Sequence, residues 1–344
     1  MENNLSNAQT IGVKIGSTYS VIAVRGGLET PVTSVIKSCV SSVIDPDTKN
    51  ISSVDIGIER PDSIFPLSKG IIENDKLIAP TVAIVKKLNA PPLSRVVAAI
   101  PALELIEGRD RLKKALRDGL CPLKMVLSPE VYCGAVNLFG YTDINGARKL
   151  KALHSDFIAL NLGSTTLEVL IALHGKRVYL NAFTGVCGSM VDYQILDTVQ
   201  NKFGKVLVTM PEIRNLKEQF NMNEPKEITF NVMTQNDGVV QVSGTSTILA
   251  VLERYVFDVC TQLVTILKNT LTPEVIAQVL DTPIVLTGGM GNIPGLSERI
   301  EQKMRDILHY DKITVLKQVD GHIAPAIGAL TLANEINWDK IPYI

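Results

Sequence analysis

Two short polar turns, each set between apolar runs, contain the residues of this chain that could hold a phosphate group. The first turn, GST at 16–18, lies between the apolar runs 11–15 and 21–24. The second, GSTT at 163–166, lies between the apolar runs 157–162 and 169–173. Two apolar runs joined by a tight turn are typical of a β-hairpin. Glycine and hydroxyl residues at the turn leave backbone N–H groups and hydroxyls available to a phosphate, so both hairpins are candidate phosphate sites.

Length and composition place limits on the rest of the chain. With 344 residues, two domains are expected, and the repeated hairpin predicts related domains facing each other across a phosphate. The formal net charge of −1 gives no reason to expect nucleic acid or an acidic membrane surface as a partner. The five cysteines are scattered without a CxxC pair, which is typical of reduced cytosolic thiols, most of them buried. Neither a signal peptide nor an apolar stretch of about 20 residues is present, so we expect a cytoplasmic protein with no direct membrane anchor.

Strand-like and helix-like segments alternate in both halves, which favours an α/β fold. The segment 26–80 is interrupted by prolines, contains short β-like runs such as 32–36, and is expected to form a small inserted subdomain. Further strands are expected at 95–100, 123–127, 176–182, 227–234, 239–242, 284–286 and 313–316. Helices are expected at 75–88, 104–119, 129–138, 190–203, 211–221, 247–270, 296–307 and 324–335.

The order of these motifs resembles the actin-like ATPase superfamily, which has the actin and heat-shock-chaperone ATPase (ribonuclease H-like) duplicated fold. Residues 11–24 and 156–173 resemble its two phosphate motifs, 284–296 its adenosine motif and 324–333 its second connecting helix. The resemblance implies domain I at 1–155, with 320–344 packing back on it. It also implies domain II at 156–319, with a second insert at about 191–254, and a nucleotide cleft between the domains.

Within the superfamily, the chain is similar to bacterial actins of the MreB and MamK type. It is most similar to the magnetosome-associated actins or to a paralogue with a degenerate active site. The likeness rests on Arg25-Gly26 after the first hairpin, FPLSKGII at 65–72, KEQF at 217–220 and ALTLANEINWDKI at 329–341. It implies a cytoskeletal filament of head-to-tail copies, because a heterologous contact that does not close generates a filament.

Three positions depart from the superfamily pattern. Relatives carry an Asp before each phosphate turn to hold hydrated Mg²⁺, whereas this chain has Lys14 and Asn161. The water-activating Glu falls on Pro129, and Glu130, one residue later, is the remaining catalytic candidate. An isolated buried ammonium is costly, so Lys14 is expected to turn to solvent or to pair with a carboxylate such as Glu168 or Glu130.

The resemblance also assigns a nucleotide-binding set. Its members are Lys14, Gly16, Ser17, Thr18, Asn161, Gly163, Ser164, Thr165, Gly188, Lys217, Glu218, Gly288, Gly289 and Met290. The implied cofactor is ATP or ADP, bound weakly, and the altered positions argue against Mg²⁺. No metal site is expected elsewhere, since the four histidines show no metal-ligand spacing.

Two interpretations of the altered positions stay open. The site has lost nucleotide and the chain is structural, or Lys14 supplies a positive charge in place of the metal. The leading functional hypothesis is a filament protein that positions an intracellular structure, of magnetosome type if the finer likeness holds, with impaired or Mg²⁺-independent hydrolysis. The alternatives are a non-polymerising adaptor that binds a partner protein or organelle surface, or that co-assembles with an active paralogue, and a small-molecule kinase. The missing metal carboxylates argue against the kinase.

Overall fold

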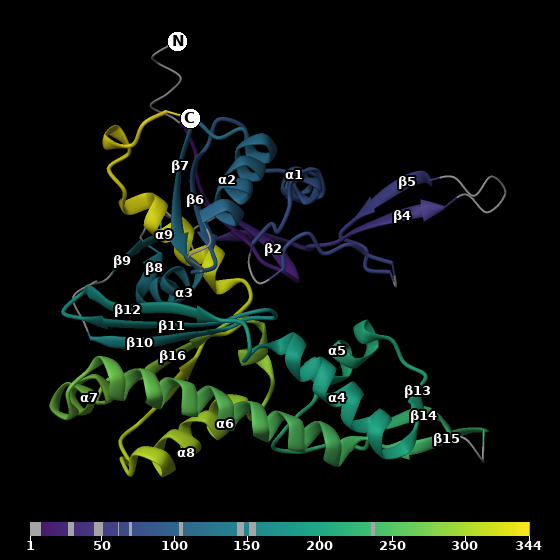
Figure 1. Cartoon of the computed structure of the whole chain (residues 1–344). Helices are drawn as coiled ribbons and strands as arrows, with labels where there is room; N and C mark the ends of the chain where they lie inside the picture. Colours follow the sequence, from purple (N-terminus) through teal and green to yellow (C-terminus); the bar gives the residue numbers. More distant parts are fainter. Residues whose placement is uncertain are drawn as a thin grey trace. The chain divides into compact units, whose positions relative to one another are not determined.

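The computed structural model describes residues 8–26, 31–44, 51–60, 62–68, 71–102, 106–142, 148–150, 156–234 and 238–343. The chain divides into two compact units. Unit 1 comprises Met1–Ser155 and Asp320–Ile344, and unit 2 comprises Asp156–Val319. Figure 1 shows the elements of each unit.

Unit 1 is built on a five-stranded sheet in the order β3-β2-β1-β6-β7. Its strands are β1 (Thr10–Ile15), β2 (Tyr19–Val24), β3 (Val32–Lys37), β6 (Arg95–Ile100) and β7 (Lys124–Pro129). The first three strands pair antiparallel, whereas β1, β6 and β7 run parallel. β1 and β6 are buried along all but their first residue, as expected for strands covered by helices on both sides.

Helices cover both faces of this sheet. Ile11, Val13 and Ile15 face one core with α1 (Ile78–Lys87) and α2 (Ile106–Leu120). Because strand side chains alternate between faces, Gly12 and Lys14 face the other side. That side is covered by α9 (Ala324–Glu335), and α3 (Glu130–Phe139) packs beside α9 in a small core with Val97 and Ala99 of β6. Lys14 is thereby placed among the helices that follow β7 and that end the chain.

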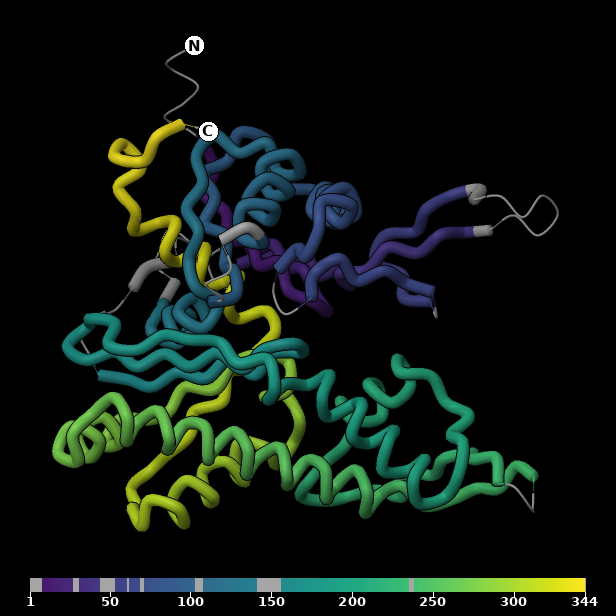
Figure 2. The backbone as a smooth tube through the Cα atoms, in the orientation of Figure 1, coloured from purple at the N-terminus to yellow at the C-terminus, as the bar shows by residue number. Residues whose placement is uncertain are grey.

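The remaining elements of unit 1 are small. β4 (Val40–Ile44) and β5 (Ile51–Ile56) form a two-stranded ribbon that extends away from the main sheet (Figure 2). β8 (Gly140–Thr142) pairs with β9 (Arg148–Leu150), and two 3₁₀ turns occupy Asp75–Leu77 and Trp338–Lys340. β3, which the sequence analysis assigned to the insert, is the edge strand of the main sheet because it pairs along its length with β2.

Unit 2 repeats the strand pattern of unit 1, with the order β12-β11-β10-β16-β17. Its strands are β10 (Phe157–Leu162), β11 (Leu167–Leu173), β12 (Lys176–Phe183), β16 (Ile284–Thr287) and β17 (Val315–Lys317). Again three strands pair antiparallel and the last two run parallel to the first strand of the unit. β10 therefore corresponds to β1, and Asn161, two residues before the turn glycine, corresponds to Lys14.

The core of unit 2 lies on one face of its sheet and includes residues of α4 (Gly188–Phe203), α6 (Thr245–Thr270) and α8 (Leu296–Leu308). Alternate residues of β10 and β11 belong to this core, so Asn161 and Glu168 lie on the opposite face. A three-stranded sheet holds β13 (Lys205–Val206), β14 (Thr229–Thr234) and β15 (Gly238–Ser243), next to α5 (Met210–Gln219). A short 3₁₀ turn at Gly289–Asn292 follows β16.

The strands and helices expected from the sequence are present, with shifted ends. The helix expected at 104–119 is described from Ile106, and its first two positions lie outside the described residues. The strand expected at 313–316 begins at Val315; the apolar Ile313, which suggested an earlier start, is buried in the core but lies before the strand. One helix, α7 (Pro273–Leu280), was not expected from the sequence.

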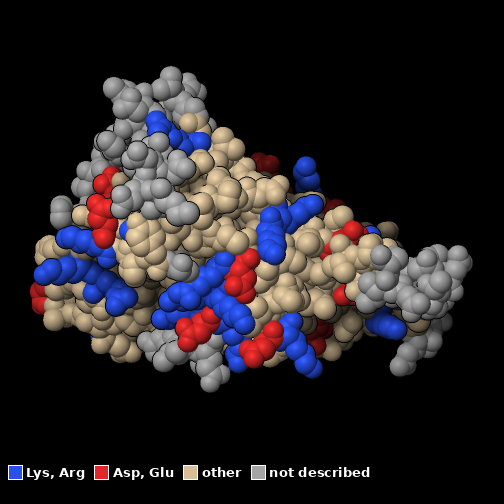
Figure 3. Space-filling model, turned by 90° about the horizontal axis from the view of Figure 1, so that it is seen from above, with Lys and Arg blue, Asp and Glu red and all other residues tan. Residues whose placement is uncertain are grey.

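Surface charge is mixed in sign on the face that Figure 3 shows, where acidic side chains lie among the basic ones. One ion pair of this kind joins Arg111 of α2 to Asp75, at 2.7 Å. Four of the five free cysteines are buried and Cys121 is exposed. Within the described parts of the chain, no helix has the length and apolar character that crossing a membrane requires.

The contact between α9 and α3 depends on a glycine, and Gly328→Ala tests it. A Cβ built on Gly328 would lie 1.7 Å from the carbonyl oxygen of Cys133 in α3, so the two backbones would have to separate. In an ordinary helix this substitution stabilises by about 1 kcal/mol. Here we expect a loss of about 1–3 kcal/mol or more in the free energy of unfolding, measured by thermal or denaturant unfolding.

The matched control is Gly185→Ala in the loop before α4, where a Cβ would meet no atom within 4 Å. It is expected to change the free energy of unfolding by no more than about 0.5 kcal/mol. Equal losses in the two variants would contradict the close packing of α9 on α3.

Candidate functional site

The first candidate turn joins β1 to β2 and lies directly over the side chain of Lys14. The Gly16 N–H donates to the carbonyl oxygen of Tyr19, at 3.2 Å, and closes the turn. A Cβ built on Gly16 would lie 3.1 Å from Cε and 3.6 Å from Nζ of Lys14, so the ammonium group lies under this turn. Ser17 and Thr18 form the half-buried tip.

The ammonium of Lys14 joins three segments of unit 1. Its Nζ lies 2.9 Å from Oε1 of Glu130, and both side chains are less than 10% exposed, at 8% and 6%. It also donates to the carbonyl oxygen of His322, at 3.1 Å, in the segment that leads into α9. A buried charge is tolerated when it is paired and hydrogen-bonded, and both conditions are met here.

Glu130 is suited to be the partner because it is the first residue of α3. A carboxylate at a helix N-terminus interacts favourably with the helix dipole. Pro129, at the N-cap position, holds no side-chain hydrogen bond. Of the two carboxylates that the sequence analysis weighed as partners for Lys14, the structure selects Glu130.

The second candidate turn joins β10 to β11 and repeats the first. The Gly163 N–H donates to the carbonyl oxygen of Thr166, at 2.9 Å. The turn carbonyls then accept hydrogen bonds from the start of α4. Gly188 N–H donates to Gly163, at 3.0 Å, and Ser189 N–H donates to Ser164, at 2.7 Å. The turn is therefore anchored to α4, with Ser164 and Thr165 half-buried at its tip.

Asn161 and Glu168 are opposite each other on β10 and β11. Asn161 Nδ2 donates to Oε1 of Glu168, at 3.3 Å, and both residues are buried. The other amide atom, Asn161 Oδ1, is buried and finds no hydrogen-bond partner among the described residues. Gly288, which has a φ of +93°, packs against it, since a Cβ there would lie 2.7 Å from Oδ1. Only glycine fits this position, for both its conformation and its space.

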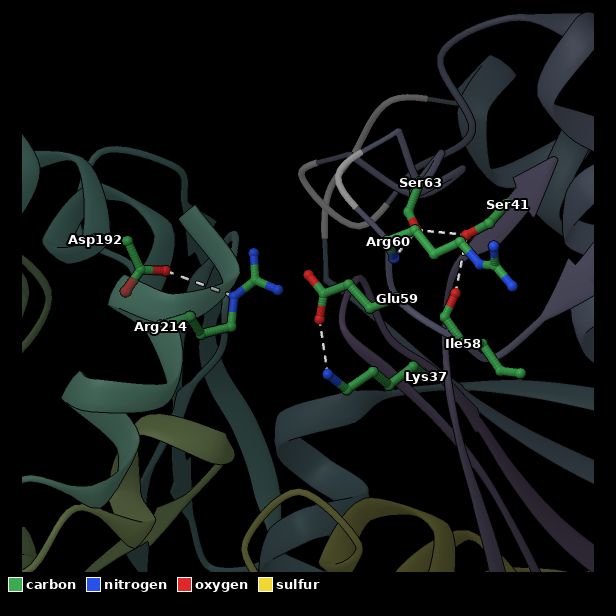
Figure 4. Close-up of polar contacts among 8 residues, drawn as sticks. All are labelled: Lys37, Ser41, Ile58, Glu59, Arg60, Ser63, Asp192 and Arg214. Carbon is green, nitrogen blue, oxygen red and sulfur yellow. Dashed lines mark hydrogen bonds and ion pairs between the residues drawn. The ribbon is translucent and has the colours of Figure 1, made fainter. Parts of the chain in front are cut away.

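Lys217 is committed to structural contacts at the start of α4. Its Nζ lies 2.6 Å from Oδ1 of Asp192 and donates to the carbonyl oxygen of Gly188, at 3.0 Å. Arg214 lies beside the same carboxylate, with Nε 3.7 Å from Oδ2 (Figure 4). Burial raises the pKa of Asp192, and the charges of Lys217 and Arg214 oppose that rise. The trio fixes α5 against α4 and holds Gly188 under the second turn.

The predicted site residues thus fall into two groups. In unit 1, Lys14 lies against Glu130 and under the turn formed by Gly16, Ser17 and Thr18. In unit 2, one connected group contains Asn161, Gly163, Ser164, Gly188, Lys217, Gly288 and Met290, whose Sδ lies 3.0 Å from a Cβ built on Gly188. Thr165 is at the turn tip, Glu218 is exposed on α5, and Gly289 is exposed, with no atom within 4 Å of a Cβ built on it.

Sequence reasoning missed Asp192 and the carbonyl of His322. Asp192 is a long-range partner of Lys217, and no local pattern marks that pairing. His322 follows Lys14 by 308 positions and takes part through its backbone, which its residue type does not reveal.

Comparison with known proteins places the chain in a family. The family model called Salactin matches residues 8–337. The chain belongs to the Salactin family. The Salactin of Halobacterium salinarum is 30% identical over 319 residues, covering 86% of this chain and 83% of the relative.

Solved structures show the fold of this Salactin-family chain. A MamK double helical filament superposes with a TM-score of 0.75 at 18% identity, over 96% of this chain and 100% of the other. MreB5 of Spiroplasma citri bound to ADP superposes with a TM-score of 0.73 at 15% identity, over 97% and 98%. The α/β actin-like ATPase fold expected from the sequence is thereby confirmed.

The fold family implies a nucleotide with Mg²⁺, and the two parts of that ligand fit this Salactin-family chain differently. The metal does not fit at position 14, where an ammonium already pairs with the nearest carboxylate. At position 161 the side chain is a neutral amide. Among the described residues, no cluster of three His, Cys, Asp or Glu side chains could hold a metal. The two turns are better suited to hold phosphate, because their tips are only half-buried. Gly289, after β16, is exposed, and its backbone is accessible to a ligand.

The pairing of Lys14 with Glu130 can be measured by a double-mutant cycle with Lys14→Met and Glu130→Met. Each single variant leaves one buried charge unpaired, so we expect each to lose about 3 kcal/mol or more in the free energy of unfolding. The double variant leaves neither charge and is expected to lose less than either single variant. The chain has one tryptophan, Trp338, buried in unit 1, and its fluorescence reports the unfolding of that unit.

A matched control is Arg60→Met, which breaks the ion pair with Asp55 in the same unit. The two side chains are 42% and 27% exposed, so the expected loss is at most about 1 kcal/mol. Additive losses in the cycle of Lys14 and Glu130 would contradict a direct interaction.

His322 is expected to make unit 1 less stable in acid. Its ring lies beside that of Tyr19, with centroids 5.5 Å apart and the ring planes tilted by 48°. Burial, followed by the charge of Lys14, lowers the pKa of His322 below the ordinary value of 6.5. The unfolded chain therefore binds a proton more readily than the folded chain. The stability contribution is present above about pH 6.5 and is lost as the pH falls through the folded pKa.

Denaturant unfolding of the wild type and of His322→Gln, followed by Trp338 fluorescence between about pH 7.5 and pH 5, checks this sign. The wild type should lose stability more steeply on acidification than the variant. Parallel pH profiles would show that His322 does not contribute.

Proposed function

We propose that this chain is an actin-like cytoskeletal filament protein whose copies assemble head to tail in the cytoplasm. The observation that carries the proposal is the whole-length likeness to a protein solved as a double helical filament, with a TM-score of 0.75 and all of that chain covered. Membership of the Salactin family supports it. A filament of this kind positions an intracellular structure, and a cargo of magnetosome type stays a prediction from the finer sequence likeness to MamK.

Adenine nucleotide is proposed to bind at the two turns of the hairpins β1–β2 and β10–β11. Support comes from their matching geometry, because in each turn the leading glycine N–H donates to the carbonyl oxygen three residues on. The backbone and hydroxyl groups of Ser17, Thr18, Ser164 and Thr165 would hold the phosphates. Lys217 acts as a positioning residue, since its ammonium holds the Gly188 carbonyl rather than standing free.

Hydrolysis is proposed to be slow. Glu130, the remaining catalytic candidate, is tied to Lys14 and so is poorly placed to take a proton from water. Nucleotide would then at most modulate filament assembly, and the assembled filament would carry out the function.

The same ion pair favours a second candidate function, a non-polymerising adaptor of the actin fold. If the Lys14–Glu130 pair marks a site that has lost nucleotide binding, the chain would bind a partner protein or co-assemble with an active actin-like paralogue. A small-molecule kinase is not supported, because phosphoryl transfer relies on bound metal and position 14 excludes it.

Pelleting and negative-stain microscopy of the full chain distinguish these functions. Purified protein is incubated without nucleotide, with ADP and with ATP, at several protein concentrations. We expect regular filaments and a pelleted fraction that appears above a threshold concentration, whereas amorphous aggregate shows no regular subunit spacing. Absence of filaments in every condition would overturn the filament proposal and favour the adaptor.

A further inference from the structure

We propose that the Lys14–Glu130 pair takes the place of the divalent cation, so that this chain binds adenine nucleotide as the free polyphosphate rather than as the metal complex. The inference rests on the proposed nucleotide function of the site. It names the form of the ligand, which differs from the metal complex that the fold family implies.

The position of the ammonium carries the inference. Lys14 Nζ lies beneath Gly16, with 3.6 Å between it and a Cβ built on that residue, so it approaches the turn proposed to hold phosphate. Glu130 and the His322 carbonyl take two of its three N–H donors. Among the described residues no third partner contacts it, which leaves one donor for a phosphate oxygen. A charge-assisted bond of this kind is among the strongest hydrogen bonds in proteins.

Glu130 serves as the counter-ion of this arrangement and is a positioning residue. Its carboxylate pairs with the buried ammonium at 2.9 Å and holds it beneath the turn. A Mg²⁺ ion would need this carboxylate as a ligand and would have to displace the ammonium. The ammonium is covalently attached and its side chain is 8% exposed, so it has little room to withdraw.

The charges agree with the geometry. Relative to a pattern with Asp at position 14, lysine raises the fixed charge beside the first turn by two units. This equals the two units that a divalent cation supplies. A polyphosphate at this turn would therefore meet the same charge from the chain itself.

The first test compares the affinity of the full wild-type chain for ADP and for ATP in excess EDTA and in saturating Mg²⁺, at constant ionic strength, by isothermal titration calorimetry. Saturating Mg²⁺ converts most of the nucleotide to the metal complex, so we expect apparent dissociation constants that are at least about threefold lower in EDTA than in Mg²⁺. A smaller difference, or tighter binding with Mg²⁺, would overturn the inference.

The second test uses variants at position 14 under the same conditions. Lys14→Met should weaken ADP binding in EDTA by about tenfold or more, because the charged donor is gone. Lys14→Asp places a carboxylate beside Glu130 and should make ADP bind about tenfold or more tightly in Mg²⁺ than in EDTA. The matched control Arg60→Met, which breaks the exposed Arg60–Asp55 pair, should leave both dissociation constants unchanged. Equal losses for Lys14→Met and Arg60→Met would overturn a specific role for Lys14.

The outcomes separate this inference from the proposed function. If a variant at position 14 does not fold, the wild-type comparison in EDTA and Mg²⁺ decides by itself. Wild-type protein that binds neither nucleotide in either condition would overturn the inference. Filaments scored by microscopy in the same samples report independently on whether the chain polymerises.

Discussion

The ion pair between Lys14 and Glu130 is the interaction on which the candidate site depends. A lysine near the end of a buried strand must find an anion within reach, because an unpaired buried ammonium would shift the balance toward unfolding. Glu130 provides it from the first turn of α3, and the His322 carbonyl adds a second acceptor. These contacts fix β1, α3 and the start of α9 relative to one another. The same contacts determine what kind of ligand the first turn can accept.

The two units share the same hairpin but have chemically different side chains before its turn. Each has a hairpin closed by a glycine N–H, with a polar residue two positions before that glycine. In unit 1 this residue is a cation held by a carboxylate. In unit 2 it is an amide that donates to the carboxylate of Glu168 on the neighbouring strand. The arrangement of strands is nevertheless the same in both units, because it depends on apolar alternation and hydrogen bonding rather than on the polar residue.

Much of the fold could be predicted from the sequence, because it is written in local patterns. Apolar runs around GST and GSTT marked both hairpins, and the small-residue run at 324–335 coincides with α9. α7 was not predicted because it is short. β17 was predicted to start too early because the apolar Ile313 of the core precedes it. At the site, the need of Lys14 for a carboxylate followed from its charge. The choice of Glu130, and the pairing of Lys217 with Asp192, depended on contacts between distant segments that no local pattern encodes.

Unit 1 is discontinuous in the chain, and this affects the order in which the molecule can be completed. Its first part ends at Ser155, all of unit 2 follows, and α9 arrives only with the segment from Asp320 onward. During synthesis, a ribosome therefore releases every residue of unit 2 before the helix that covers one face of the β1 sheet. Until then, that face of β1 lacks its cover, and Lys14 lacks the His322 carbonyl. Synthesis of unit 1 thus begins first, but its chain is completed last, which reverses the usual N-terminal-first order of domain folding.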